Sequence, residues 1–231
     1  MKSEKQRNVE KFIEKCLANG ASQSAFDKIA NYLLKKCQLR IENNAYYFTE
    51  IEFYCHELTG AWKDTSIYAV KYENDSKRQI EWKRATEMQS QLGYFFEHGS
   101  GIDFTFGKAK IRYGGILIRG IAPQKEKNDN SELQSQPTKV WKKFKDIPFE
   151  KWNTSITIEE NNNEKNITIF QGPRINIDDY RPLRYAIDLN RKDKEGLVFS
   201  SFLCGKLKNG DVLLGTSYEK WWKIYKSIIK Q

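Results

Sequence analysis

The spacing of apolar residues near the start of the chain is that of a helix. Over residues 4–19 apolar side chains recur every three or four positions, which predicts an amphipathic helix that stops at Gly20. A second stretch with the same spacing follows Ser24, which would serve as its N-cap. The two stretches predict an N-terminal helical hairpin over residues 1–40, with its apolar stripes facing a core.

From Tyr46 onward the period changes to two, as in half-buried strands. Strands are predicted at 46–55, 101–107, 115–121, 154–159, 165–170, 182–188 and 197–203. A short helix is predicted over 80–91, and a last helix over 217–230 carries a stripe that includes two tryptophans. Residues 124–139 hold no aromatic and one leucine, so they are predicted to form a mobile loop.

These elements define an α+β class with a curved, largely antiparallel sheet. The length of 231 residues and the hydrophobic content of 39% suit a single domain with a sizeable core. We expect the core to span residues 41–215, with the C-terminal helix over 216–231. A β-hairpin is expected to project from this core.

The charge balance favours an anionic partner. The chain has 39 Lys and Arg against 30 Asp and Glu, for a net charge of +9. Nucleic acid is the first candidate and an anionic membrane surface the second, although many lysine-rich chains are merely basic. The 4 cysteines form no CxxC pair and there are 2 histidines, so no zinc site and no cofactor are expected. No apolar run is long enough for a membrane span, and a cytoplasmic, nucleoid-associated protein is expected.

The stretch FTEIEFY at residues 48–54 contains two carboxylates inside a strand-like run. Strict alternation would place Phe48, Glu50, Glu52 and Tyr54 on one face of the strand. Such a face is either exposed to solvent or the floor of a site.

A second informative stretch, residues 93–121, predicts a hairpin with its tip at Phe106-Gly107-Lys108. An exposed aromatic ring beside cations is suited to intercalation between DNA base pairs. Lys108, Lys110 and Arg112 would then contact phosphates of the DNA backbone. The alternative is an ordinary hairpin in which Phe106 is buried.

The order of these motifs resembles the alkyladenine (3-methyladenine) DNA glycosylases. TEIEFY is similar to the family's "ETEAY" strand, and GSGIDFTFG with YGGILIRGI is similar to its "YVYxxYG" hairpin and "VLIRA" strand. Gly172-Pro173-Arg174 is similar to its "GP" turn, and residues 181–187, RPLRYAI, to its "PLRFYV" segment. The likeness covers about residues 46–188.

The resemblance implies base excision without a metal or a covalent intermediate. It implies that Glu52 is the general base that activates water against a flipped-out nucleotide, with Tyr54 stacked on the extruded base. Phe106 would fill the gap left by that nucleotide and Arg119 would orient the site. Glu50 matches a glutamate with a structural role.

Two positions depart from the family's pattern. Tyr68, at the end of the turn 64–68, stands where the family has a base-contacting histidine, and Asp103 stands where it has a second stacking tyrosine. In the pocket Asp103 would accept hydrogen bonds from an exocyclic amine or oppose Glu52 as a like charge. The alternative is an ordinary residue at a strand end.

Three functions follow as hypotheses. The first is a monomeric, monofunctional DNA glycosylase acting on duplex DNA that contains a modified base. The second is a non-catalytic nucleic-acid-binding protein on the same scaffold, motivated by Tyr68 and Asp103. The third is an interaction protein that docks a partner through its terminal helices and Lys142, Lys143 and Lys145.

Overall fold

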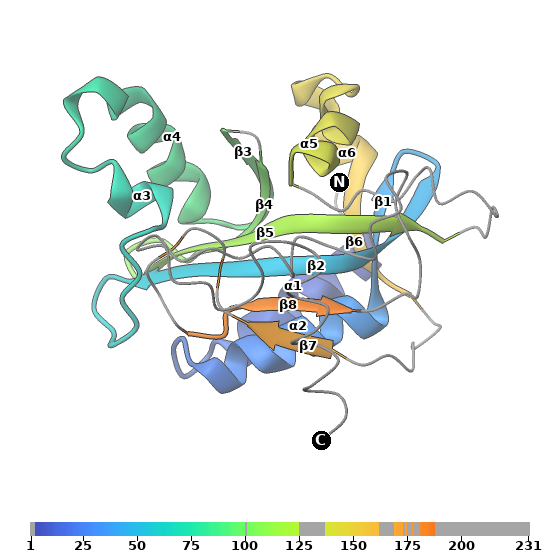
Figure 1. The fold of residues 1–231 in the computed structure, drawn as a ribbon, viewed down its shortest axis with the longest axis horizontal. Helices are drawn as coiled ribbons and strands as arrows, with labels where there is room; N and C mark the ends of the chain where they lie inside the picture. The colour runs from blue at the N-terminus through green and yellow to red at the C-terminus, as the bar shows by residue number, and fades with distance from the viewer. Residues whose placement is uncertain are drawn as a thin grey trace, which may run out of the picture.

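A computed structural model of the chain describes residues 3–99, 101–124, 137–161, 169–172, 174, 177 and 181–187. In these residues the protein has the predicted α+β class, with helices packed on one curved antiparallel sheet (Figure 1). The strands lie in the order β3-β4-β5-β2-β1-β6, while β8 pairs with both β2 and β7.

The helices and strands have the following bounds. The helical elements are α1 Glu4–Cys16, α2 Gln23–Lys36, α3 Tyr68–Lys71, η1 Ser76–Arg78, α4 Gln79–Gln89, α5 Pro137–Lys145, η3 Phe149–Lys151 and α6 Trp152–Ser155. The strands are β1 Cys37–Ile41, β2 Asn44–Glu57, β3 Leu92–His98, β4 Gly101–Phe106, β5 Arg112–Pro123, β6 Ile156–Glu160, β7 Ile169–Gly172 and β8 Arg184–Ile187.

The N-terminal helical hairpin is present, with corrected boundaries. The hydroxyl of Ser3 caps α1 by accepting from the Gln6 amide, and the hydroxyl of Ser22 caps α2 by accepting from the Ala25 amide. The cap of the second helix is therefore Ser22, two residues before the predicted Ser24. The hairpin ends at Lys36 because the chain enters the sheet at once as β1.

One face of the sheet is apolar and packs on these helices. Phe26 of α2 contacts Phe53 of β2 and Phe106 of β4, with ring centroids 4.9 Å and 6.1 Å apart. Phe144 of α5 adds to the same core through Phe95 of β3, at 5.3 Å. The opposite face of β2 and β5 carries the buried polar side chains of Glu50, Glu52 and Arg119 and is called the polar face below.

A β-bulge corrects the predicted alternation along β2. The register against β5 shifts on both sides of Glu50, so Phe48 joins Ile51 and Phe53 in the core instead of sharing a face with Glu50. Between Phe48 and Glu50 the extra residue is on β2, which reverses the alternation along β2 at that point, and between Glu50 and Ile51 a compensating extra residue is on β5. Glu50 and Glu52 are both fully buried, so their face is not exposed to solvent.

The hairpin of β4 and β5 turns where it was predicted, but its aromatic is not exposed. Phe106 is fully buried, and a Cβ at Gly114 would lie 2.6 Å from its ring. An intercalating role for Phe106 is therefore wrong, because the ring is already a core contact of α2. Arg112 is also buried, donating to the carbonyls of Phe106 and Leu17, so its predicted phosphate contact is wrong as well.

Other predictions fall into three groups. The helix at 80–91 is confirmed as α4, and strands were predicted at β2, β4, β5, β6 and β8; the strand predicted at 165–170 overlaps β7 at residues 169 and 170. The sequence patterns missed β1, β3, α3 and α5, and α5 begins at residue 137, inside the segment predicted as a loop. The predicted strand 197–203, the C-terminal helix and most of 124–139 lie outside the described residues.

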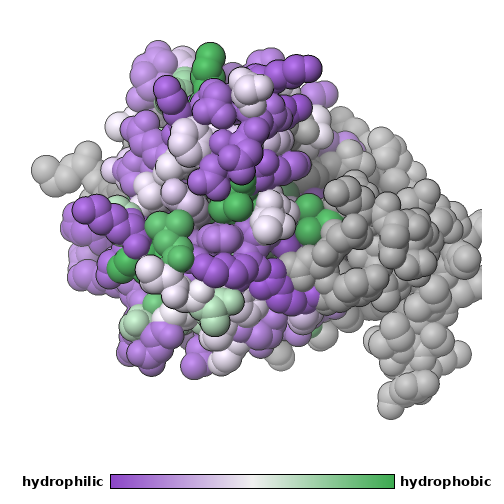
Figure 2. Space-filling model, turned by 90° about the vertical axis from the view of Figure 1, so that its left-hand side faces the viewer, coloured by the Kyte–Doolittle hydropathy of each residue, from purple (hydrophilic) through white to green (hydrophobic). Residues whose placement is uncertain are grey.

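The surface seen from the side of α3 and α4 is mainly hydrophilic, with separate hydrophobic side chains between the polar ones (Figure 2). Among the described helices, none is both long and apolar enough to cross a membrane.

Candidate functional site

A buried cluster of four charged side chains lies on the polar face of the sheet. Nε of Arg119, on β5, is 2.9 Å from Oε1 of Glu50, and its Nη1 is 3.3 Å from Oε2 of Glu52. Nε of Arg184, on β8, lies 3.1 Å from the same Oε1 of Glu50. Three strands thus contribute to one cluster.

The cluster is balanced in charge, with two carboxylates and two guanidiniums. Burial alone would lower the pKa of Arg119, but the carboxylates of Glu52 and Glu50 outweigh it and raise that pKa above the usual value. Buried charges are tolerated when they are paired and hydrogen-bonded in this way. Arg119 therefore stays cationic and holds Glu52 in a fixed position.

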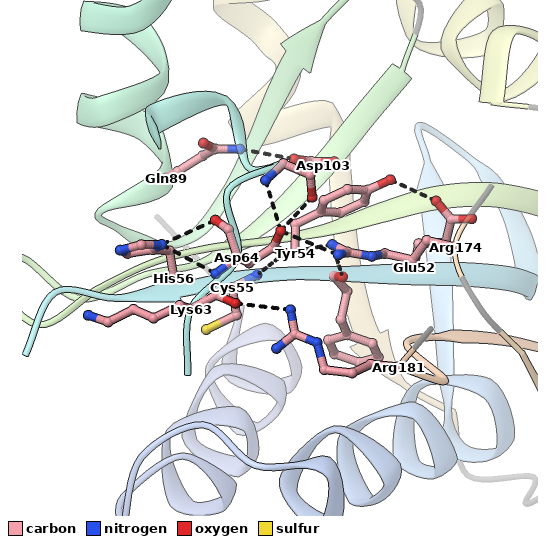
Figure 3. Close-up of polar contacts among 12 residues, drawn as sticks. Glu52, Tyr54, Cys55, His56, Lys63, Asp64, Gln89, Asp103, Arg174 and Arg181 are labelled. Carbon is pink, nitrogen blue, oxygen red and sulfur yellow. Dashed lines mark hydrogen bonds and ion pairs between the residues drawn. The ribbon is translucent and has the colours of Figure 1, made fainter. Parts of the chain in front are cut away.

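Tyr54 connects this cluster to the surface. Its hydroxyl donates to Oε2 of Glu52 at 2.8 Å, and both burial and the nearby Glu52 charge raise its pKa well above 10 (Figure 3). The guanidinium of Arg174 lies over its ring, 4.7 Å from the centroid. Arg174 is in turn paired with Asp64, at 2.6 Å and 3.3 Å. The tyrosine is thus held at both its hydroxyl and its ring.

A cavity of about 240 Å³ opens beside Tyr54. Its lining comes from β2, β3 and β4, from residues 66–89, which include α3 and α4, and from Ile177, between β7 and β8. The lining residues are Tyr54, Ser66, Ile67, Tyr68, Lys71, Gln89, His98, Asp103 and Ile177. Drug-sized ligands usually occupy larger pockets, so this volume suits one small ring system.

Asp103 is the acidic residue of the cavity wall. Its Oδ1 lies 2.8 Å from Nε2 of His98, and its Oδ2 accepts from Nε2 of Gln89 at 3.3 Å. Since an ionised carboxylate only accepts, Nε2 of His98 carries the proton in this contact. A Cβ at Gly115 would lie 2.5 Å from Oδ2, so the glycine on β5 gives the carboxylate its space.

Aromatic rings form another part of the wall. Tyr68 packs against His98 at 4.5 Å and against Tyr72 at 4.8 Å between ring centroids. Burial, followed by the neighbouring Tyr72, raises the pKa of Tyr68 to about 12, so its hydroxyl stays protonated at neutral pH. Lys71 lies over both rings, which places one cation at the cavity.

The structure brings together five of the residues singled out in the sequence. Tyr54, Tyr68 and Asp103 line the cavity, while Glu52 and Arg119 lie directly behind Tyr54. Their chemical roles remain predictions. Lys108 and Lys110 are exposed in the turn between β4 and β5, and Phe106 and Arg112 are in the interior.

Sequence reasoning missed His98, Gln89, Arg184 and the pair of Asp64 with Arg174. The sequence does contain a signal for His98. His98 is the last residue of β3, Asp103 is two residues past its partner Gly101 on β4, and the two side chains therefore lie on the same face of that hairpin. Arg184 and Arg174 come from segments distant in sequence, so no local pattern links them to the site.

Among the residues that the structure describes, no group of three or more His, Cys, Asp or Glu side chains could hold a metal ion. Comparison with known proteins yields no matching family model, and no curated protein matches the chain. The chemistry of the cavity residues is therefore the guide to function.

Proposed function

We propose that this protein is a monofunctional DNA glycosylase, which hydrolyses the N-glycosidic bond of a nucleotide whose base enters the cavity. The observation that carries the proposal is the convergence of Tyr54, Tyr68 and Asp103 on one cavity, with the Glu52–Arg119 pair directly behind Tyr54. Flat aromatic walls and one polar wall suit a nucleobase.

In the proposed reaction, water attacks the sugar carbon that bears the base. Glu52 activates that water through the Tyr54 hydroxyl: the water gives a proton to the hydroxyl oxygen, and the hydroxyl's own proton passes to Glu52. The new carbon–oxygen bond forms, and the electron pair of the broken bond leaves with the base. Arg119 keeps Glu52 in position through the contact between Nη1 and Oε2. Lys71, Lys108 and Lys110 supply cations for the DNA backbone.

The experiment is a base-release assay on duplexes that each contain one alkylated, deaminated or otherwise modified base. Abasic sites are detected by alkaline cleavage, with Glu52→Gln compared with the wild type. Glu159→Gln is the matched control, because Glu159 also pairs with an arginine, Arg40, but on β6 at the far edge of the sheet.

We expect abasic product from the wild type and from Glu159→Gln, and none from Glu52→Gln. Circular dichroism must show that Glu52→Gln is folded. If no duplex in the panel gives product while salt-sensitive DNA binding persists, the hydrolase proposal fails.

A second candidate is a non-catalytic nucleic-acid-binding protein. It is favoured by the complete burial of Glu52, whose carboxylate is engaged by Arg119 and by the Tyr54 hydroxyl. In that case Glu52 has a structural role, and Glu52→Gln weakens stability without changing any property of the bound DNA.

A further inference from the structure

We infer that the cavity selects bases with a guanine-type edge, in which a ring N–H and an exocyclic amino group lie side by side, and that Asp103 reads this edge. The inference rests on the proposed function, since it takes the cavity to be where the base is received. It adds the class of base and the residue that recognises it.

The surroundings of Asp103 make its carboxylate a hydrogen-bond acceptor. Oε1 of Gln89 accepts from the backbone amide of Ala69 at 3.0 Å, so the Gln89 amino group faces Asp103. His98 donates to the other carboxylate oxygen. Both neighbours therefore present donors, and both orient a carboxylate whose residue is only 1% exposed.

This carboxylate has capacity beyond those two contacts. An ionised carboxylate offers about four lone-pair sites on two oxygens, and each oxygen has one protein donor in the contacts above. The complementary partner is an edge with two adjacent donors, which matches a carboxylate as the arginine fork does. Guanine presents such an edge, with its ring N1–H beside its 2-amino group.

The aromatic walls fit a flat ring but do not distinguish between bases. Tyr54, Tyr68 and His98 offer ring surfaces, and stacking on such surfaces tolerates every base. The volume of about 240 Å³ suits a base without its sugar. Discrimination must therefore come from a polar side chain, and Asp103 is the carboxylate in the lining.

The test uses free bases, so it needs no bond cleavage. Binding of 9-methylguanine, 9-methylhypoxanthine and 9-methyl-2-aminopurine to the full chain is measured by NMR titration. The methyl group stands where the sugar would be attached. The second compound lacks the 2-amino group, and the third lacks the ring N–H.

We expect 9-methylguanine to bind at least about tenfold more tightly than either analogue, because each analogue loses one hydrogen bond to a charged acceptor. In Asp103→Asn, which replaces one acceptor oxygen by a donor, the preference should fall to about one. Asp146→Asn, at an exposed carboxylate after α5, should retain the wild-type preference.

Equal binding of the three bases by the wild type, or no binding of any, overturns the inference without the need for a variant. An unchanged preference in folded Asp103→Asn overturns it as well. Selective binding without base release supports the inference and removes the hydrolase proposal. Release of guanine-type and hypoxanthine-type bases at equal rates supports the hydrolase proposal and overturns the inference.

Discussion

Glu50 and Glu52 are neighbours on the polar face of β2, and one guanidinium, that of Arg119, contacts both. Two like charges in a buried strand would repel each other, and the positive charge of Arg119, in contact with both carboxylates, offsets that repulsion. Arg184 completes the neutralisation from β8. The position of Glu52 thus depends on Glu50, and both carboxylates lie behind the cavity wall, outside its lining.

Removing the charge of Glu50 should therefore lower the free energy of unfolding. Glu50→Gln leaves Arg119 and Arg184 with one carboxylate between them, and breaking a buried pair costs about 3–5 kcal/mol. Urea denaturation measures the loss. A double-mutant cycle with Arg184→Met should give a coupling free energy of about 0.5–3 kcal/mol.

Glu159→Gln is the control for that measurement. Its partner Arg40 has a side chain that is 42% exposed, so water can replace the lost contact, and the new amide oxygen can still accept from Gln38. We therefore expect a loss of only about 1 kcal/mol. Equal losses in Glu50→Gln and Glu159→Gln would contradict a special role for the buried cluster.

The core position of Phe106 gives a second prediction. Phe106→Ala should lose about 3–5 kcal/mol of stability, because it removes a buried ring from the contact between α2 and the sheet. Gly114→Ala should also destabilise, since its new Cβ meets that ring at 2.6 Å. Chemical denaturation of both variants and of the double variant tests the contact.

The double variant shows whether the side chains at positions 106 and 114 interact or act independently on stability. In Phe106→Ala the ring that obstructs Cβ at position 114 is absent, so adding Gly114→Ala should cost less than it does in the wild type. Strictly additive losses would show that the two residues do not interact.

The sequence could predict what local periodicity encodes. The helical hairpin, α4 and the strands that carry Glu52, Asp103 and Arg119 all follow from residue spacing. The bulge at Glu50 and the burial of Phe106 could not be predicted this way, because they depend on β5 and α2 as packing partners. For the same reason the pocket contacts of Gln89, which come from the end of α4, became visible only in the fold.

Stability should fall as the pH rises above about 10, the ordinary pKa of tyrosine. Burial raises the pKa of Tyr54, Tyr68 and Tyr185, to about 12 for Tyr68. Above pH 10 the unfolded chain therefore loses protons that the folded chain keeps, so the unfolded state gains in relative stability. Urea midpoints between pH 8 and about 11 measure this slope.

Tyr185→Phe tests whether a buried tyrosine causes the fall in stability above pH 10. Burial raises the pKa of Tyr185, and so does the contact with Asp27, to which its hydroxyl donates at 2.7 Å. Without that hydroxyl the slope above pH 10 should become shallower. An unchanged slope would assign the effect to other groups.

The proposed DNA contact of the β4–β5 turn can be tested through salt. If Lys108 and Lys110 lie on phosphates, each change to Ala should reduce the slope of log K against log salt by about 1. Lys11→Ala and Lys28→Ala, at exposed positions on the helical hairpin, serve as controls and should leave the slope unchanged. Equal effects at all four positions would indicate general electrostatic attraction without a defined contact.

Gly115 does not line the cavity, but it should affect the choice of base by leaving room for the Asp103 carboxylate. In Gly115→Ala the new Cβ would lie 2.5 Å from Oδ2 of Asp103, so the carboxylate must move away from Gln89 and His98. We expect the preference for 9-methylguanine over 9-methylhypoxanthine to shrink toward one while the protein stays folded. Gly60→Ala, which meets Glu57 outside the cavity, is the matched glycine control and should keep the preference. A preserved preference in Gly115→Ala would mean that the position of the Asp103 carboxylate does not set the choice of base.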